Sequence, residues 1–226
     1  MREIILDTET TGFDPAQGDR IVEIGCVEAH SHIATGETFH VYINPERDMP
    51  ESAFNVHGLS EEFLSDKPVF AEVAENFLSF IGDAPLVIHN AEFDMKFLNS
   101  ELKKISRPIL PRDRAIDTVA MARRKFPGAQ ANLDALCRRF DIDLSRRDKH
   151  GALLDAELLA EVYLQLCGGL QPDLELSGNQ TRSDSPVAVQ RQARVPRAHA
   201  PSPEELAAHA ALVETLTEPV WDSDES

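Results

Sequence analysis

A short apolar run, Ile4-Ile5-Leu6, leads directly into two acidic residues, Asp7 and Glu9. The run is typical of a strand that enters a core, and side chains two positions apart on an extended chain point to the same face. Two like charges on one face beside a core repel each other and lose hydration unless a positive partner offsets them. The segment is therefore either a strand whose end frays into a solvated turn or part of an acidic site.

The composition limits which kind of acidic site is reasonable. The chain has 226 residues, 42% of them hydrophobic, and a formal net charge of −17. That length allows one good-sized domain with an appendage, or two small domains. The negative charge argues against a protein that holds nucleic acid by itself, because non-specific affinity comes mainly from Lys and Arg on phosphates. It permits an acidic site that works through divalent cations, or a subunit whose nucleic acid is held by a partner.

The sequence shows no targeting or cross-linking signal. Its apolar stretches are shorter than the roughly 18–20 residues of a membrane helix, and strand-like sequence begins at residue 3, so we expect neither membrane contact nor a secretory signal. The three cysteines, Cys26, Cys137 and Cys167, are odd in number and far apart. We expect them to be small buried hydrophobes in a reducing compartment, which makes the cytoplasm the expected location.

Hydrophobic periodicity predicts an α/β domain. Strands are expected over 3–6, 20–29, 37–44 and 85–90. Helices are expected over 68–82, 93–105, 132–142 and 152–166, and 115–128 is expected to pass from strand to helix. The second and third strands should form an antiparallel hairpin with Gly36 at its turn. Residues 45–60 are expected to be a loop that ends where Ser60 starts a helix, and Asn132 is expected to cap another.

The composition changes after Gly168-Gly169. Residues 170–202 are rich in Ser, Gln, Arg and Pro without a sustained period, which predicts a flexible linker. An amphipathic helix follows over 202–216, opened by Ser202 with Pro203 in its first turn. The expected organisation is an α/β domain over 1–168, a linker over 169–202 and a helical tail over 203–226.

Two more acids lie where a site could gather. Asp94 follows the strand expected over 85–90, and such strand ends form the functional crevice of open α/β sheets. Asp155 lies on an apolar helix, where a carboxylate is costly unless it is paired or bound to a metal. His150 would point about 140° away from Asp155 on one helix, so it can join Asp155 only from a loop before the helix, with Gly151 as the bend. Taken alone, each of these residues is more often structural than catalytic.

Acids without a matching basic cluster suit hard cations. Mg²⁺ and Mn²⁺ take oxygen ligands, and two such ions about 3.5–4 Å apart clamp the attacking and leaving oxygens of a phosphoryl displacement. A histidine that titrates near neutral pH is suited to take a proton from the attacking water. The acids in combination with His150 therefore indicate two-metal phosphoryl transfer.

Four motifs resemble the exonucleases of the DEDD superfamily, in the subgroup with a catalytic histidine: LDTETTG, VHGLS, VIHNAEFDMKFL and HGALLDAELLAEVYL. The resemblance continues through FPG and NLDALCRRF to the family of proofreading epsilon subunits of bacterial DNA polymerase III. It covers 1–168 in uninterrupted order. It implies a ribonuclease-H-like mixed sheet flanked by helices, in which the first three strands are antiparallel.

The resemblance also implies a site and a reaction. The residues implied to hold two divalent cations, Mg²⁺ or Mn²⁺, are Asp7, Glu9, Asp94 and Asp155. His150 is implied as the general base. The residues implied to contact substrate are Asp7, Glu9, Thr10, His57 and Asp155. The implied reaction removes nucleoside 5′-monophosphates one at a time from a DNA 3′ end, and it favours mismatched ends because they unpair more cheaply.

The tail resembles partner-binding segments of the same family. Gln171, Leu174 and Leu176 form Q-x-x-L-x-L, which is similar to peptides that bind the bacterial sliding clamp. The terminal helix resembles the segment that anchors the exonuclease to the polymerase alpha subunit, and a small theta-like subunit is a further implied partner. An amphipathic helix on a tether commonly docks into a partner groove, and the tether raises the effective concentration at the primer end.

Two alternatives stay open at this point. A free-standing exoribonuclease that acts on RNA or tRNA 3′ ends would share the motifs, although such an enzyme has little use for a tether and terminal helix. A non-catalytic assembly subunit would keep the domain as a scaffold, although the intact acids and His150 argue against it.

Overall fold

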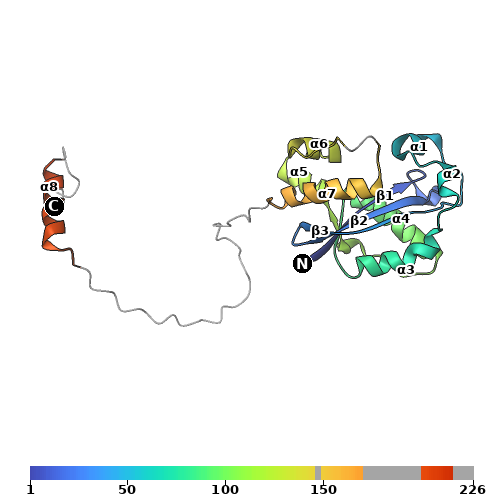
Figure 1. Ribbon diagram of the computed structural model, residues 1–226, viewed down its shortest axis with the longest axis horizontal. Coiled ribbons are helices and arrows are strands. Elements are labelled where there is room, and N and C mark those ends of the chain that lie inside the picture. Colours follow the sequence, from blue (N-terminus) through green and yellow to red (C-terminus); the bar gives the residue numbers. More distant parts are fainter. Residues whose placement is uncertain (146–148, 170–199, 216–226) are drawn as a thin grey trace. The chain divides into compact units, whose positions relative to one another are not determined.

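The computed structural model describes residues 1–145, 149–169 and 200–215 (Figure 1). The chain divides into two units, residues 1–175 and 176–226. The first unit contains a five-stranded sheet in the order β3-β2-β1-β4-β5. Its strands are β1 (Arg2–Thr10), β2 (Ile21–His30), β3 (Ile33–Tyr42), β4 (Leu86–Ile88) and β5 (Ala115–Asp117). The first three strands are antiparallel and β4 and β5 run parallel to β1, which confirms the expected mixed sheet.

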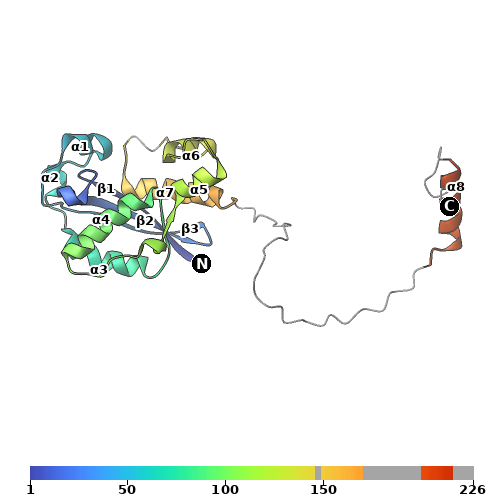
Figure 2. The ribbon, with the colours of Figure 1, turned by 180° about the vertical axis from the view of Figure 1, so that it is seen from behind.

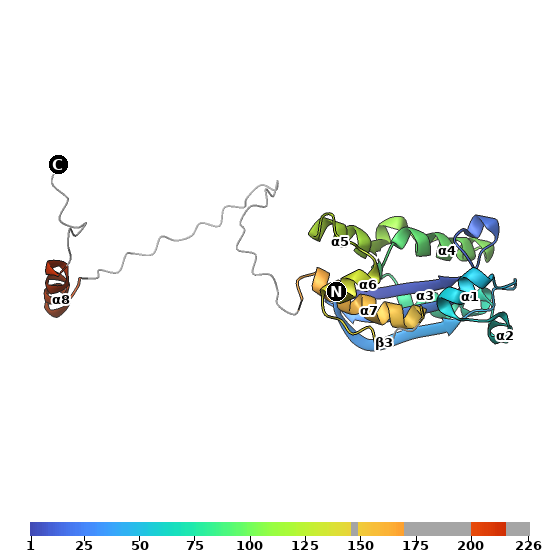
Figure 3. The same ribbon diagram turned by 90° about the horizontal axis from the view of Figure 1, so that it is seen from above.

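Helices cover both faces of this sheet. On one face lie α3 (Phe70–Ile81) and α4 (Ala91–Lys104); on the other lie α5 (Thr118–Lys125), α6 (Leu133–Arg139) and α7 (Ala152–Leu166). Helix α7 is in front of the sheet in Figure 1 and α4 is in front in Figure 2, which views the molecule from behind. The short helices α1 (Glu51–His57) and α2 (Glu61–Leu64) lie at one end of the sheet (Figure 3).

Strand β1 separates two hydrophobic cores because its side chains alternate. Ile4 and Leu6 are buried on the side of α3 and α4, and Ile5 is buried on the side of α7. By the same alternation Asp7 and Glu9 continue the face of Ile5 toward α7. The strand predicted over 3–6 thus extends to residue 10 and carries both acids inside the sheet.

Two local predictions were wrong. The hairpin turns at Ser31 and His32, whose φ angles of 51° and 69° suit a two-residue turn, whereas Gly36 (φ 92°) lies inside β3. The pairing of β2 with β3 shifts register opposite that stretch, so Gly36 belongs to a bulge. Residues 45–60 contain α1 rather than only a loop; a helix of seven residues is too short to show a clear period.

The other helix signals are confirmed. The Ser60 and Asn132 side chains accept hydrogen bonds from Phe63 N and Ala135 N at the starts of α2 and α6. Helix α3 ends at Gly82, as expected. Cys26 and Cys137 are buried and Cys167 is partly buried, as expected for small hydrophobic side chains.

Helix α8 (Pro203–Glu214) is described by itself. Its Ser202 and Glu205 form a reciprocal capping box, and Pro203 occupies the first turn. Residues 170–199 of the linker predicted over 169–202 lie outside the described residues, and with them the predicted clamp-binding residues Gln171, Leu174 and Leu176. In the described part of the chain, no helix is long and apolar enough to cross a membrane.

Candidate active site

Strand β1 presents Asp7 and Glu9 beside an opening in the sheet. Its pairing with β4 runs from Ile4 to Leu6 and stops one residue before Asp7. On its other edge β1 pairs with β2, which places Asp7 opposite Gly25 and Glu9 opposite Glu23. The two acids therefore lie on the α7 face, at the end of the short parallel pairing where a crevice can form.

Gly25 allows the start of α7 to lie directly on the strands. A Cβ built at Gly25 would be 2.3 Å from the backbone carbon of Ala152 and from the nitrogen of Leu153. Only a residue without a side chain permits this approach. The close contact brings Asp155, in the first turn of α7 and buried, over the acids of β1.

His150 lies in the segment before α7, as its sequence distance from Asp155 requires. Its Nδ1 is 3.2 Å from Asp155 Oδ2. Glu9, His150 and Asp155 each offer one ligand atom, and these atoms lie within 4.8 Å of one another. Gly151 caps the helix in an ordinary extended conformation with φ −159°, so the bend there does not depend on glycine.

Asp94 approaches from the opposite layer. It belongs to the first turn of α4 and is buried, and its Oδ1 accepts a hydrogen bond of 2.7 Å from the Thr8 hydroxyl. Thr8 faces α4 because it alternates with Asp7 along β1. The site thus combines side chains from both helical layers and from the strand between them.

Burial and mutual repulsion destabilise the ionised form of these acids, and a bound positive charge would offset both effects. Burial raises the pKa of Asp7 well above its ordinary value, and the charges of Asp94, Glu9, Asp155 and Glu23 raise it further. Burial also raises the pKa of Asp94 to about 7, although the hydrogen bond from Thr8 acts in the opposite direction. Close, desolvated carboxylates with these pKa shifts suit a bound cation, and their oxygen donors fit hard divalent ions.

Glu23 was not among the predicted site residues. This residue of β2 is buried opposite Glu9, and its Oε1 lies 2.7 Å from His40 Nε2. Its position within the apolar run Ile21-Val22-Glu23-Ile24 could have identified it from the sequence, because a charge in a buried strand needs a partner or a function.

Two predicted substrate-contacting residues lie beside the cluster. Thr10 is buried on β1 and its hydroxyl donates to the Gly12 carbonyl at 2.6 Å. His57 is the last residue of α1, and its Nδ1 accepts from Leu59 N at 3.0 Å. Burial lowers the pKa of His57, opposed by the nearby charge of Glu23, so this ring favours its neutral form.

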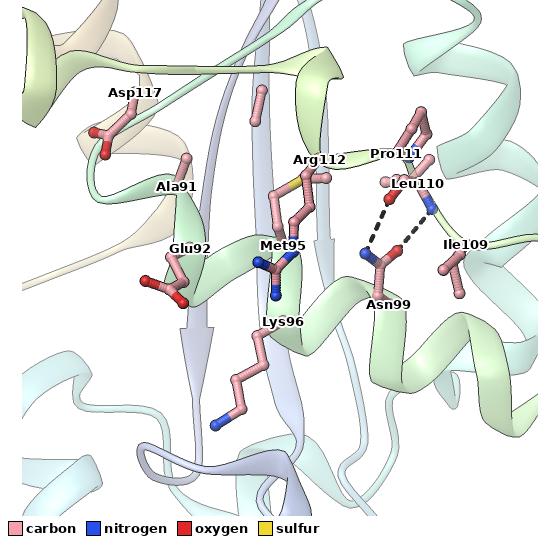
Figure 4. Close-up of a pocket in the computed structure, with 11 residues that line it drawn as sticks. Ala91, Glu92, Met95, Lys96, Asn99, Ile109, Leu110, Pro111, Arg112 and Asp117 are labelled. Carbon is pink, nitrogen blue, oxygen red and sulfur yellow. Dashed lines mark hydrogen bonds between the residues drawn. The ribbon is translucent and has the colours of Figure 1, made fainter.

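A cavity of about 890 Å³ lies next to the acid cluster, between α4 and the segment that leads into β5 (Figure 4). Lys96 and Arg112 reach into it, and Asn99 forms two hydrogen bonds with the Leu110 backbone at its wall. Asp117 lines one end, and its charge adds to the raised pKa of Asp94. The cavity is therefore adjacent to the acids but separate from the Glu9–His150–Asp155 group.

Comparison with known proteins identifies relatives over nearly the whole chain. Residues 4–163 match the exonuclease family RNase T. The DNA polymerase III subunit epsilon of Rickettsia felis is 50% identical over 222 residues, which cover 96% of this chain and 97% of the relative. The DNA polymerase III subunit epsilon of Escherichia coli K12 is 44% identical over 226 residues, which cover 95% of this chain and 93% of the relative.

Solved structures share the fold. Exonuclease X, in complex with 5′-overhanging duplex DNA, is 25% identical with a TM-score of 0.57 over 73% of this chain and 90% of that chain. The nuclease domain of 3′hExo, a DEDDh family member bound to rAMP, is 20% identical with a TM-score of 0.64 over 73% of this chain and 90% of that chain. The second likeness concerns the fold alone.

Proposed function

This chain belongs to the exonuclease family and, within it, to the DNA polymerase III epsilon subunits, and on that premise we propose that it proofreads DNA by two-metal 3′→5′ hydrolysis. The observation that carries the proposal is the meeting of Glu9, His150 and Asp155 within 4.8 Å. Asp7 and Asp94 adjoin this group with raised pKa values. A set of desolvated acids with one imidazole suits phosphodiester hydrolysis better than any structural role.

Members of this exonuclease fold use divalent cations, and the donors present here fit them. We propose two ions, Mg²⁺ or Mn²⁺. The residues proposed to hold them are Asp7, Glu9, Asp94 and Asp155. When bound, such ions acidify a water molecule and stabilise the leaving 3′ oxygen. The Thr8 hydroxyl fixes the Asp94 carboxylate, since its hydrogen bond of 2.7 Å orients one oxygen and leaves the other for the site.

His150 is proposed as the general base. With its hydrogen on Nδ1, the ring would donate to Asp155 Oδ2 at 3.2 Å, and the lone pair of Nε2 would then take a proton from the attacking water. Half of the His150 side chain is accessible, with 49% of its surface exposed, whereas Asp155 is buried. The carboxylate thereby orients a ring that water can reach.

The substrate contacts and the partners are also proposed. Thr10 and His57 would contact the terminal nucleotide together with Asp7, Glu9 and Asp155, which is supported by their places beside the acids. An epsilon subunit associates with its polymerase and with DNA. We assign the alpha-subunit contact to the tail over 203–226, the clamp contact to residues 171–176 of the linker 169–202, and catalysis to residues 1–168. We also propose a theta-like subunit as a partner and the cytoplasm as the location.

Digestion of a 3′-labelled DNA primer tests the proposal. Paired and mismatched primers are incubated with Mg²⁺, with Mn²⁺ or with EDTA, and wild type is compared with Asp7→Ala/Glu9→Ala. We expect stepwise loss of mononucleotides, faster at the mismatch and absent in EDTA and in the variant. The exposed Asp113→Asn is the matched control and should keep wild-type rates. Activity on RNA ends without activity on DNA would favour the exoribonuclease alternative, and inactivity on both substrates would favour the scaffold.

A further inference from the structure

Helix α1 holds the segment that carries His150. The His150 N–H donates to the Val56 carbonyl at 3.3 Å. The Lys149 ammonium lies 5.0 Å from the centroid of the Phe54 ring. Val56 and Phe54 both belong to α1, which lies beside the start of α7 in Figure 3. Two consecutive residues before α7 are thus attached to one short helix.

Gly58 brings the end of α1 against Lys149. Its φ of 76° is left-handed, which suits glycine, and a Cβ there would be 2.8 Å from Lys149 Cδ and 3.0 Å from its Nζ. The aliphatic stem of the lysine therefore passes directly over the backbone of Gly58 while its ammonium reaches the ring of Phe54. The lysine is packed in a defined place, although it lies at the surface.

We propose that Lys149 and Phe54 are positioning residues that hold His150 where it acts as the base, an inference that rests on the function proposed above. The Val56 contact fixes the His150 backbone, and the Lys149–Phe54 contact fixes the residue before it. With the backbone of His150 held in place, its Nδ1 lies 3.2 Å from Asp155 Oδ2. Placement matters because a displacement of about 1 Å can lower a rate about 100-fold.

A different role for Lys149 is attraction of DNA phosphates, and kinetics separate the two roles. A positioning lysine changes kcat, and its effect depends on Phe54. A phosphate-binding lysine changes KM, its effect fades as salt rises, and it does not depend on Phe54. Both residues lie at the surface, with Phe54 36% exposed, so variants at either position are expected to fold.

The test is steady-state digestion of a 3′-labelled single strand by the full-length chain with Mg²⁺. The variants are Lys149→Met, Lys149→Arg, Phe54→Leu, Phe54→Tyr and the double variant Phe54→Leu/Lys149→Met. We expect Lys149→Met and Phe54→Leu each to lower kcat about 3- to 30-fold at unchanged KM, and the double variant to be no slower than the singles. Lys149→Arg and Phe54→Tyr keep a cation over a ring and should keep the wild-type kcat.

Lys67→Met is the matched control. It removes an ammonium that lies 4.5 Å from the ring centroid of Phe63, on α2, and should leave kcat unchanged. A raised KM at unchanged kcat, additive losses in the double variant, or wild-type kcat in both single variants would each overturn the positioning role and leave the proposed nuclease intact. An inactive wild type would overturn the proposed function itself.

Discussion

Asp94 makes stability depend on pH. Burial raises its pKa to about 7, whereas an unfolded chain would give it a value near 4. The folded state therefore keeps this proton longer than the unfolded state, and folding stability falls as pH rises from about 4 to about 7. We expect the metal-free protein to lose at most about 1.4 kcal/mol per pH unit through this group.

Thermal unfolding in EDTA at pH 5 and pH 8 measures this dependence. Asp94→Asn keeps the shape of the side chain without its charge, so it should raise Tm at pH 8 by roughly 2–4 °C for each kcal/mol regained and change little at pH 5. The exposed Asp113→Asn should match wild type at both pH values. A wild-type Tm that is no lower at pH 8 than at pH 5 would contradict the buried, uncompensated state of Asp94.

Gly25 is expected to be intolerant of even one methyl group. Alanine there would place Cβ 2.3 Å from the backbone of Ala152 and Leu153, which cannot rotate away. Gly25→Ala should push α7 off the strand, lower stability by about 1–3 kcal/mol or more and lower nuclease activity about 100-fold through the shift of Asp155. Urea unfolding and primer digestion measure the two effects.

Gly151→Ala supplies the matched control for stability. It adds the same methyl group where no atom lies within 4 Å and where φ is −159°. Because glycine caps a helix better than alanine, Gly151→Ala should cost about 0.5–1 kcal/mol, which is less than the loss expected for Gly25→Ala. Equal stability of the two alanine variants would show that α7 can move without cost.

An ion pair between partly buried Arg20 and buried Glu101 joins the start of β2 to α4. Arg20 places Nε 2.6 Å and Nη2 2.9 Å from the two carboxylate oxygens of Glu101, which is 1% exposed. Arg20→Met should lower the free energy of unfolding by about 2–4 kcal/mol, because the buried carboxylate loses its main partner. Adding Glu101→Gln should recover part of that loss, and urea unfolding measures both.

The exposed pair between Lys96 and Asp14 serves as the comparison, because it joins the neighbouring loop to the same helix at 2.8 Å. Lys96→Met should cost less than about 1 kcal/mol. If Arg20→Met and Lys96→Met lower the free energy of unfolding equally, the burial of Glu101 does not determine the strength of its ion pair with Arg20.

The elements that were predicted from sequence are those whose determinants are local. Ser60, Asn132 and Ser202 each cap a helix through bonds to residues three positions away. The hairpin turn was misplaced because Gly36 and the Ser31–His32 pair are both acceptable turns locally, and the register between β2 and β3 decides between them. Short-range pattern carries no information about that register.

The candidate site also contains residues that local sequence indicates and residues whose position depends on the tertiary structure. Motif spacing and resemblance pointed to Asp7 and Asp155, but the burial of Glu23 follows from its pairing with Glu9 across β1 and β2. The approach of Asp94 from the opposite layer depends likewise on how α4 packs, which only the tertiary structure shows.

Catalysis and attachment to the polymerase are expected to depend on separate parts of the chain. Helix α8 carries exposed Leu206 (55%) and Leu212 (59%), and a helix of 12 residues is marginal by itself in water. Removal of residues 200–226 should leave the Tm and the nuclease rate of the first unit unchanged and abolish co-elution with the purified polymerase alpha subunit. Gel filtration measures the association. A chain that lacks only 216–226 keeps α8 and is the control; loss of co-elution there would place the contact beyond α8.

The position of α7 over β1 also has a consequence for biosynthesis. Asp7 and Glu9 belong to β1, whereas His150 lies just before α7 and Asp155 lies in its first turn. A nascent chain exposes its first two acids long before the ribosome releases the others. Until translation passes α7, the growing polypeptide lacks the proposed base and one of the proposed metal-binding acids, so on this proposal a half-made chain cannot cut DNA.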